Sequence, residues 1–394
     1  MRNIPVAGPI LVALAIALGV PAAARTNQPA AATVQSDPRA AARTAIRRAM
    51  AADQIPAMAV AVYQEGRLIW SEAFGMADLE HNVPARTDSL FRIGSVAKVL
   101  TATLAVRLAE QGLVDLDRPI RDYLSEWPER HPPITLRQLL GHLGGIRHYV
   151  PRDFDASQPG GRNDLRLYPD RASILSLFAG DDLVARPGER FHYSTFGYTL
   201  AGLVLEAATG RDYMALLREH VLSPGGIEDI QLDDFFAVVP RRVENYDATE
   251  DYRGMVAPSA GAVVNAVPLN SAYKVPGGGL VGSAPALARF GALHFAPGFV
   301  GEAMYRDLFT VQQTGAGEAT GTGLGWRIGV DESGRRIFHH SGSQQGSRAH
   351  ILVCPEQRLS VAILSNLGNR PRDIAALAHV IAPSFLARGS DPRH

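Results

Sequence analysis

At residues 95–112 the chain reads SVAKVLTATLAVRLAEQG. This stretch contains no proline, and between Lys98 and Arg107 it carries no charge. Its apolar residues fall on almost every side of a helix, which is typical of a helix buried in the centre of a domain. Ser95 lies on the first turn, three residues before Lys98, so the two side chains are neighbours on the predicted helix surface.

Lysine is rare in this chain. Lys98 and Lys274 are the only two lysines, against 37 arginines. A lysine acts as a base once burial or a neighbouring charge lowers its pKa, whereas arginine stays protonated. A desolvated Lys98 is therefore predicted to take the proton of Ser95, near a helix N-terminus that stabilises negative charge and next to Gly94, which allows close backbone approach. In the alternative interpretation Ser95 only caps the helix and Lys98 extends its ammonium to the surface.

Two further groups of polar residues follow. Tyr193 precedes Ser194 and Thr195, either of which can cap an apolar helix that runs to about Ala208. A phenol beside a lysine can ionise or relay a proton. His340-Ser341-Gly342 is predicted to lie on a strand, where the glycine leaves room for a substrate backbone and the histidine supplies a polar or cationic group.

Taken in chain order, these motifs resemble the signature of the penicillin-recognising serine hydrolases. That signature is Ser-x-x-Lys, Tyr-x-Asn, and Lys-Thr-Gly or His-x-Gly, and the family contains class C β-lactamases, D-alanyl-D-alanine carboxypeptidases, esterases and peptidases. The resemblance covers roughly residues 38–388. The strings at 139–149, 193–200 and 270–280 (LLGHLGGIRHY, YSTFGYTL and NSAYKVPGGGL) look like the serine β-lactamase-like proteases of animal mitochondria.

The resemblance implies roles for four residues. Ser95 matches the nucleophile, Lys98 its base and Tyr193 the proton relay. His340 stands where the family has lysine or histidine on the strand that lines the site. An acyl-enzyme on Ser95 that water then hydrolyses is the implied intermediate.

It also implies a substrate-binding set. The backbone N–H groups of Ser95 and of Ser343, just after Gly342, match the oxyanion hole. Thr195 departs from the family's asparagine and lacks an amide donor, so the usual hydrogen bond to a substrate amide is in doubt. Lys274 precedes three glycines and is expected either to contact a substrate carboxylate or to be a plain surface lysine.

The fold expected from the resemblance is α/β (α+β) and β-lactamase/transpeptidase-like. It has a mostly antiparallel sheet flanked by helices, plus an inserted helical lobe, with the active site between them. Within the hydrolase domain, 38–388, the α/β part is expected at about 38–92 and 275–388 and the helical insertion at about 93–274. Residue patterns alone predict helices at 39–52 and 372–386 and strands at 58–63, 68–74, 349–353 and 359–364.

The N-terminal residues predict export. Residues 1–24 contain Arg2, an apolar run and a small-residue cleavage site, which together are typical of a signal peptide, and 25–37 form a flexible linker. An uncleaved anchor is the alternative, but the apolar run is short for a membrane span. The expected location is periplasmic or secreted.

Composition limits the partners. The 39 basic and 39 acidic residues balance, and no basic tract with interleaved aromatics is present, so nucleic-acid binding has no support. A metal site is not expected, because His339 and His340 point to opposite faces of a strand and His142 suits a structural role at a helix end. Cys354 suits a small strand residue better than a nucleophile. No cofactor is expected, and the oligomeric state is left open.

The sequence therefore predicts a secreted serine hydrolase that acts on peptide, amide or ester substrates. A β-lactamase and a D-alanyl-D-alanine carboxypeptidase are alternatives of the same chemistry. A non-turnover penicillin-binding sensor or a self-assembling scaffold is the alternative from another class, although a scaffold would not need the complete Ser, Lys and Tyr positions. Residues 150–186 and 239–274 are expected to be loops that shape specificity or serve as structural padding.

Overall fold

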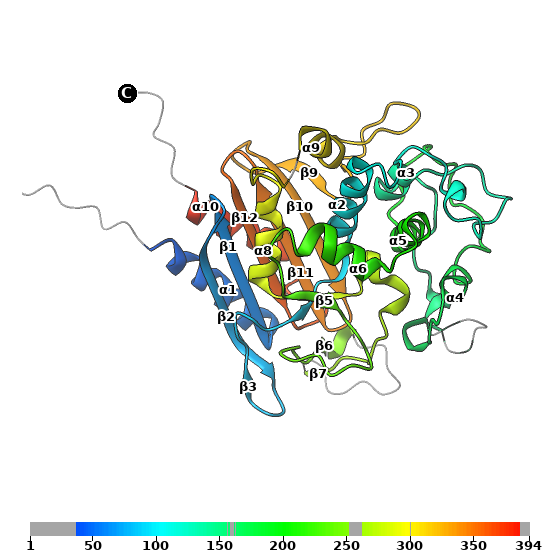
Figure 1. Ribbon diagram of the computed structural model, residues 1–394. Coiled ribbons are helices and arrows are strands. Elements are labelled where there is room, and N and C mark those ends of the chain that lie inside the picture. Colours follow the sequence, from blue (N-terminus) through cyan, green and yellow to red (C-terminus); the bar gives the residue numbers. More distant parts are fainter. Residues whose placement is uncertain are drawn as a thin grey trace, which may run out of the picture. The chain divides into compact units, whose positions relative to one another are not determined.

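The computed structural model describes residues 37–155, 157, 161, 163–251, 262–299 and 301–386 (Figure 1). Its main element is a seven-stranded sheet in which all neighbouring strands run antiparallel, in the order β3–β2–β1–β12–β11–β10–β9. The strands are β1 Ala57–Gln64, β2 Arg67–Asp78, β3 Val83–Pro84, β9 Arg327–Val330, β10 Arg336–Gln344, β11 Ser347–Cys354 and β12 Leu359–Ser365. Since β1 pairs with β12, the sheet joins the first and last parts of the described domain.

Both faces of the sheet are buried, as strand β1 illustrates. Ala57, Ala59 and Ala61 belong to one core, while the alternating Met58, Val60 and Val62 belong to the other. Helix α8 (Ala284–Leu293) packs against the alanine side, and α1 (Pro38–Asp53) and α10 (Ile374–Phe385) cover the opposite side (Figure 1). The two-sided burial confirms the predicted antiparallel sheet flanked by helices.

The predicted central helix is α2 (Ala97–Glu110), in which every residue from Ala97 to Val106 is buried. Its beginning differs from the expectation. Ser95 lies in a 3₁₀ turn, Gly94–Val96, rather than in the first α-helical turn. Gly94 has a φ of +49°, which turns the chain inward from β4 (Phe91–Arg92), and the tight turn then leads directly into α2.

Helix α5 (Thr195–Thr209) begins where the sequence predicts. The Ser194 hydroxyl accepts a hydrogen bond from the Gly197 N–H at 2.9 Å, so the cap is Ser194 and not Thr195. The other helices are α3 Leu136–Leu140, α4 Arg171–Leu175, α6 Tyr213–Leu217, α7 Val275–Gly278 and α9 Glu302–Phe309. The remaining strands form two small sheets, β4 with β8 (Leu280–Gly282) and β5 (Ile230–Leu232), and β6 (Tyr246–Ala248) with β7 (Val263–Asn265).

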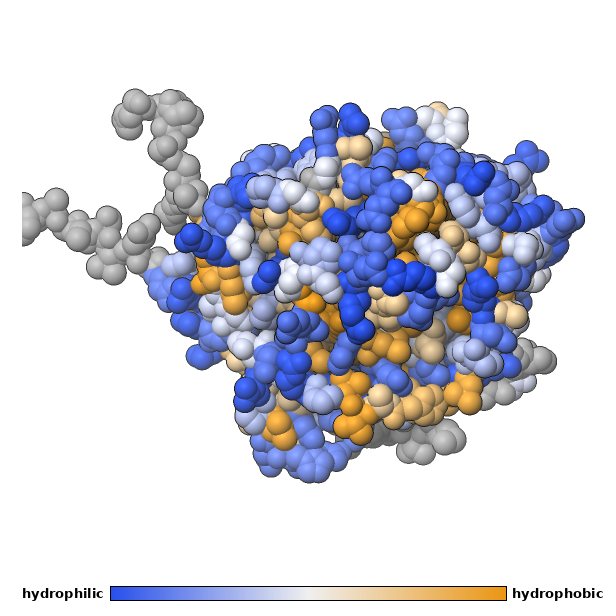
Figure 2. All heavy atoms as spheres, viewed as in Figure 1, coloured by the Kyte–Doolittle hydropathy of each residue, from blue (hydrophilic) through white to orange (hydrophobic). Residues whose placement is uncertain are grey.

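Several other predictions concern the surface and the ends of the chain. The predicted signal peptide, 1–24, lies outside the described residues, as does the linker except Asp37. Within the described part, no helix is long and apolar enough to span a membrane. Cys354 is the buried last residue of β11, and burial raises the pKa of its thiol to about 12. Figure 2 shows a mainly hydrophilic face interrupted by separate hydrophobic patches.

Candidate active site

Lys98 is the central side chain of the candidate site. Its Nζ atom lies 3.1 Å from Ser95 Oγ, 3.0 Å from Thr195 Oγ1 and 2.7 Å from the carbonyl oxygen of Gly277. The Lys98 side chain, on the first turn of α2, is fully buried. The helix spacing of three residues brings Ser95 into reach, while α5 and α7 supply the other two oxygens.

These surroundings disfavour a charge on Lys98. All three contacts are with neutral oxygens, and burial, aided by the nearby cation of Lys274, holds the pKa of Lys98 well below its usual value. In the neutral form, the amine has two N–H donors for Gly277 and Thr195. Its lone pair then faces the hydroxyl of Ser95. The arrangement suits proton abstraction, and the interpretation of Lys98 as a surface-reaching side chain is wrong.

Tyr193 contacts the same serine. Its phenol interacts with the Ser95 side chain, and Lys98 Nζ lies 5.0 Å from the centre of its ring. Burial raises the pKa of Tyr193 to about 12. Tyr193 is therefore a neutral hydroxyl near pH 7, able to donate and accept protons but not ionised.

His340 lies on β10 with its ring centre 6.4 Å from that of Tyr193. Its Nδ1 atom lies 2.7 Å from the carbonyl oxygen of Ser341, to which a protonated Nδ1 donates. Burial, with a smaller contribution from Lys98, lowers the pKa of His340 to about 3. The imidazole is thus neutral, with the lone pair on Nε2. The sequence left open whether His340 is a polar or a cationic group, and this environment favours the polar, uncharged form.

Two glycines bring the backbones of the nucleophile turn and β10 together. A Cβ on Gly342 would lie 2.0 Å from the carbonyl oxygen of Ile93 and 3.1 Å from the Ser95 nitrogen, and one on Gly94 would lie 2.9 Å from the Ser343 nitrogen. Only glycine permits this contact. The amides expected to form an oxyanion hole therefore belong to backbone segments in direct contact.

Lys274, on the short 3₁₀ turn before α7, also belongs to this region. Its side chain is largely buried, with the residue 7% exposed and Nζ 5.7 Å from the centre of the Tyr273 ring. It lies close enough to Lys98 to lower the pKa of that amine. The alternative of a plain surface lysine is wrong, and Lys274 lies in the same region of the structure as Lys98.

The sequence interpretation missed two contributors to the site, Gly277 and His148. Gly277 holds Lys98 through its carbonyl oxygen, a role that no side-chain pattern reveals. His148 and His142 accept hydrogen bonds from the backbone next to Tyr193. Both lie in the string LLGHLGGIRHY, but only His142 was given a role, as a structural residue, and its hydrogen bond to Ser194 agrees with that role.

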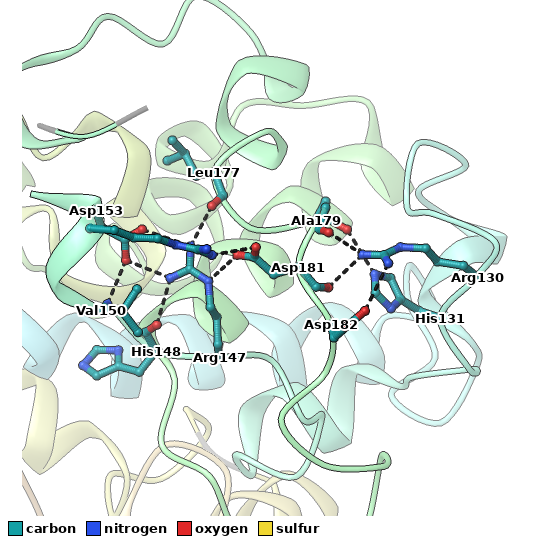
Figure 3. Close-up of polar contacts among 12 residues, drawn as sticks. Arg130, His131, Arg147, His148, Val150, Asp153, Leu177, Ala179, Asp181 and Asp182 are labelled. Carbon is teal, nitrogen blue, oxygen red and sulfur yellow. Dashed lines mark hydrogen bonds and ion pairs between the residues drawn. The ribbon is translucent and has the colours of Figure 1, made fainter. Parts of the chain in front are cut away.

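Arg147 anchors the loop of residues 150–186 to this string. Its guanidinium donates to both oxygens of Asp153 at 2.7 and 3.0 Å, to Asp181, and to the Leu177 carbonyl oxygen at 2.8 Å (Figure 3). Both Arg147 and Asp153 are buried. This part of the predicted specificity loop is held by an ion-pair network that also contacts the carbonyl oxygen of His148.

Comparison with known proteins agrees with the observed fold. The family model described as Beta-lactamase matches residues 42–383. Esterase EstB of Burkholderia gladioli is 30% identical over 337 residues, which cover 77% of this chain and 84% of the esterase. Among solved structures, the D-amino acid amidase from Ochrobactrum anthropi SV3 superimposes with a TM-score of 0.73 at 20% identity, covering 88% of this chain and 98% of the amidase.

A mitochondrial relative matches a smaller region. The human serine beta-lactamase-like protein LACTB is 28% identical over 297 residues, which cover 60% of this chain. The match spans only 52% of the human protein, so the chain corresponds to about half the length of that relative. The family match nevertheless extends over nearly the whole described domain, from α1 to α10. This chain belongs to the Beta-lactamase family and has the β-lactamase/transpeptidase-like fold.

Proposed function

We propose that the chain hydrolyses peptide, amide or ester substrates through an acyl-enzyme on Ser95, with Lys98 as the base. The observation that carries this proposal is the 3.1 Å contact between Lys98 Nζ and Ser95 Oγ in a fully buried environment. A neutral amine at this distance can remove the serine proton, and the pKa of Lys98 is lowered in the direction that this role requires.

The reaction begins when the Ser95 proton moves to Lys98 Nζ and Oγ forms a bond to the substrate carbonyl carbon. The N–H groups of Ser95 and Ser343 donate to the oxyanion that develops. The ammonium of Lys98 returns its proton through the Tyr193 hydroxyl to the leaving amine or alcohol as the carbonyl bond to that group breaks. Water then attacks the Ser95 ester, with proton transfer in the reverse direction, and releases the acid.

The substrate class follows from how the site binds an acyl group. Thr195 stands in place of the family's asparagine and uses its hydroxyl oxygen to hold Lys98, so it offers no amide donor to a substrate side chain. This favours esters and simple amides or peptides over β-lactams. The cation of Lys274 favours substrates with a carboxylate near the reacting carbonyl.

We also propose that the protein is exported, because residues 1–24 have the pattern of a signal peptide. Intact-mass analysis of the protein recovered from the periplasm or the medium tests this proposal. A mature chain that starts near residue 25 is expected, and a full-length chain recovered only from the cytoplasm would contradict export.

The decisive experiment traps the nucleophile. The protein is incubated with a fluorophosphonate probe and with p-nitrophenyl butyrate, and the modified peptide is identified by mass spectrometry. We expect one adduct on Ser95, and neither adduct nor turnover in Ser95→Ala. Modification of another residue, or unchanged turnover by Ser95→Ala, would refute the mechanism.

A further inference from the structure

Two histidines hold consecutive backbone amides of the turn that carries Tyr193. The N–H of Ser194 donates to Nδ1 of His142 at 3.1 Å, and the N–H of Thr195 donates to Nδ1 of His148 at 3.2 Å. These two amides lie at the start of α5, where N–H groups lack partners within the helix. The imidazoles therefore accept from the N–H groups of the cap residue, Ser194, and of the first helical residue, Thr195.

The same two rings also contact the phenol. The ring of His142 lies 4.4 Å from that of Tyr193 at an interplanar angle of 37°, and the ring of His148 lies 5.5 Å away at 87°, edge to face. The tyrosine ring is thus contacted by two imidazoles in different orientations. Such contacts restrict both rotation and tilt of the ring, and with them the position of its hydroxyl.

Both acceptors require neutral imidazoles. Nδ1 accepts an N–H only through its lone pair, so the proton of each ring is on Nε2. Burial keeps both rings neutral, lowering the pKa of His148 to about 4 and that of His142 well below its usual value. The charged and titratable groups facing the two rings are Lys98, Arg147, Asp153, His192, Arg327 and His340.

The segments that carry His142 and His148 are themselves held in place by hydrogen bonds and an ion pair. The carbonyl oxygen of Arg147 accepts the Ser194 hydroxyl at 2.7 Å, and the buried Arg147–Asp153 ion pair fixes the segment that carries His148. On the other side, the His192 N–H donates to the His142 carbonyl oxygen at 2.8 Å. His142 has a φ of +58°, a left-handed conformation that aims its side chain back at the turn.

We propose that His142 and His148 are positioning residues that orient Tyr193 for proton transfer, by holding the amides of Ser194 and Thr195 and packing against the phenol. The inference rests on the proposed function, since it assigns to Tyr193 the relay between Lys98 and the leaving group. It predicts that His148 affects turnover through Tyr193 rather than through substrate binding.

The test is a double-mutant cycle with p-nitrophenyl butyrate. His148→Leu removes the acceptor, and we expect kcat to fall about 10-fold or more while KM changes less than about 3-fold, because a displaced proton-transfer group slows chemistry. In a Tyr193→Phe background the same change should alter kcat less than about 2-fold, since the relay is already absent. His148→Asn, whose Oδ1 occupies the position of Nδ1, should restore kcat to within about 3-fold of the parent.

Matched variants separate this positioning role from a general loss of folding or stability. His142→Asn keeps an acceptor and a residue that tolerates the left-handed conformation, so it should retain kcat within about 3-fold. His131, a buried histidine stacked on Trp127, is a control away from Tyr193, and His131→Asn should leave kcat unchanged. Thermal unfolding is measured for every variant.

The outcomes distinguish failure of the positioning role of His142 and His148 from failure of the proposed Ser95 mechanism. Full activity in Ser95→Ala would overturn both. If Ser95→Ala is inactive, the inference alone is overturned by parent-like kcat in His148→Leu, or by equal losses from His148→Leu with and without the Tyr193 hydroxyl. Failure of His148→Asn to restore kcat in a folded protein would also overturn it.

Discussion

The side chains of Lys98 and Thr195 are joined by a hydrogen bond, with 3.0 Å between Nζ and Oγ1, although the residues are 97 positions apart in the chain. At a position where the family signature has asparagine, the structure places a hydroxyl that faces the buried lysine. The threonine therefore helps to orient Lys98.

Replacement of Lys98 by arginine should remove the base while keeping a cation. Arginine stays protonated, and its larger planar group does not fit the closely contacted space beside Gly277. We expect Lys98→Arg to lower kcat/KM about 10²-fold or more, the usual scale for loss of a general base. Steady-state ester hydrolysis on the folded variant measures this. Activity within a few-fold of the parent would exclude Lys98 as the base.

The pH dependence should show the lowered pKa of Lys98. Since the neutral amine is the active form, kcat/KM should rise with pH through the folded pKa of Lys98 and then level off. The free energy of unfolding should also rise with pH. Between the lowered folded pKa and the ordinary lysine value of about 10.4, the unfolded chain binds more protons, so this contribution grows as pH rises and is lost as pH falls.

Urea unfolding of the parent and Lys98→Met at several pH values tests the stability part of that prediction. The parent should gain stability relative to Lys98→Met as the pH increases from about 7 to about 9, which lies below the ordinary lysine pKa of about 10.4. A difference that is constant or shrinks with pH would contradict a lowered pKa.

Thr195→Asn should shift the substrate preference. Asparagine can retain an oxygen acceptor for Lys98 and adds an N–H₂ donor for a substrate amide. One such hydrogen bond contributes about 0.5–1.5 kcal/mol, so the ratio of nitrocefin to ester kcat/KM should rise about 2- to 13-fold. Efficient nitrocefin turnover by the unaltered protein would contradict the role given to Thr195.

Arg147→Met should destabilise the protein, because it leaves the buried Asp153 carboxylate without its bidentate partner. Breaking a buried ion pair in this way costs about 3–5 kcal/mol. Arg130, in the same view of Figure 3, pairs with the exposed Asp182 and is the matched control. Arg130→Ala should cost less than about 1 kcal/mol in urea unfolding. Equal losses in both variants would contradict the argument from burial.

Gly342→Ala should impair catalysis more than folding. Its methyl group would lie 2.0 Å from the Ile93 carbonyl oxygen, so the backbones that carry the Ser95 and Ser343 amides must separate. Loss of one oxyanion donor costs about 10²- to 10³-fold in kcat, and an effect near that scale is expected. Gly180→Ala, where an added Cβ meets no described atom within 4 Å, is the control and should behave as the parent.

The sequence alone was sufficient for the main helices and strands and for the pairing of Ser95 with Lys98. The short apolar run of β1, buried on both faces, and the continuous apolar surface of α2 are local patterns, so the strand and the helix appear at the residues predicted, within a few positions. The pairing of Ser95 with Lys98 is equally local, because three residues along a helix bring two side chains together.

Only the tertiary structure decided the pKa values and the orientations of the side chains at the site. The Gly277 carbonyl that holds Lys98 is 179 residues away along the chain, and the contact depends on how α7 packs against α2. Burial of Lys274, the neutral state of His340 and the contacts of His148 with the Tyr193 turn likewise come from segments far apart in sequence. A residue pattern specifies which groups are present and which face of an element they share, whereas desolvation and long-range hydrogen bonds, which set the pKa and orientation of each group, arise only when separate elements pack together.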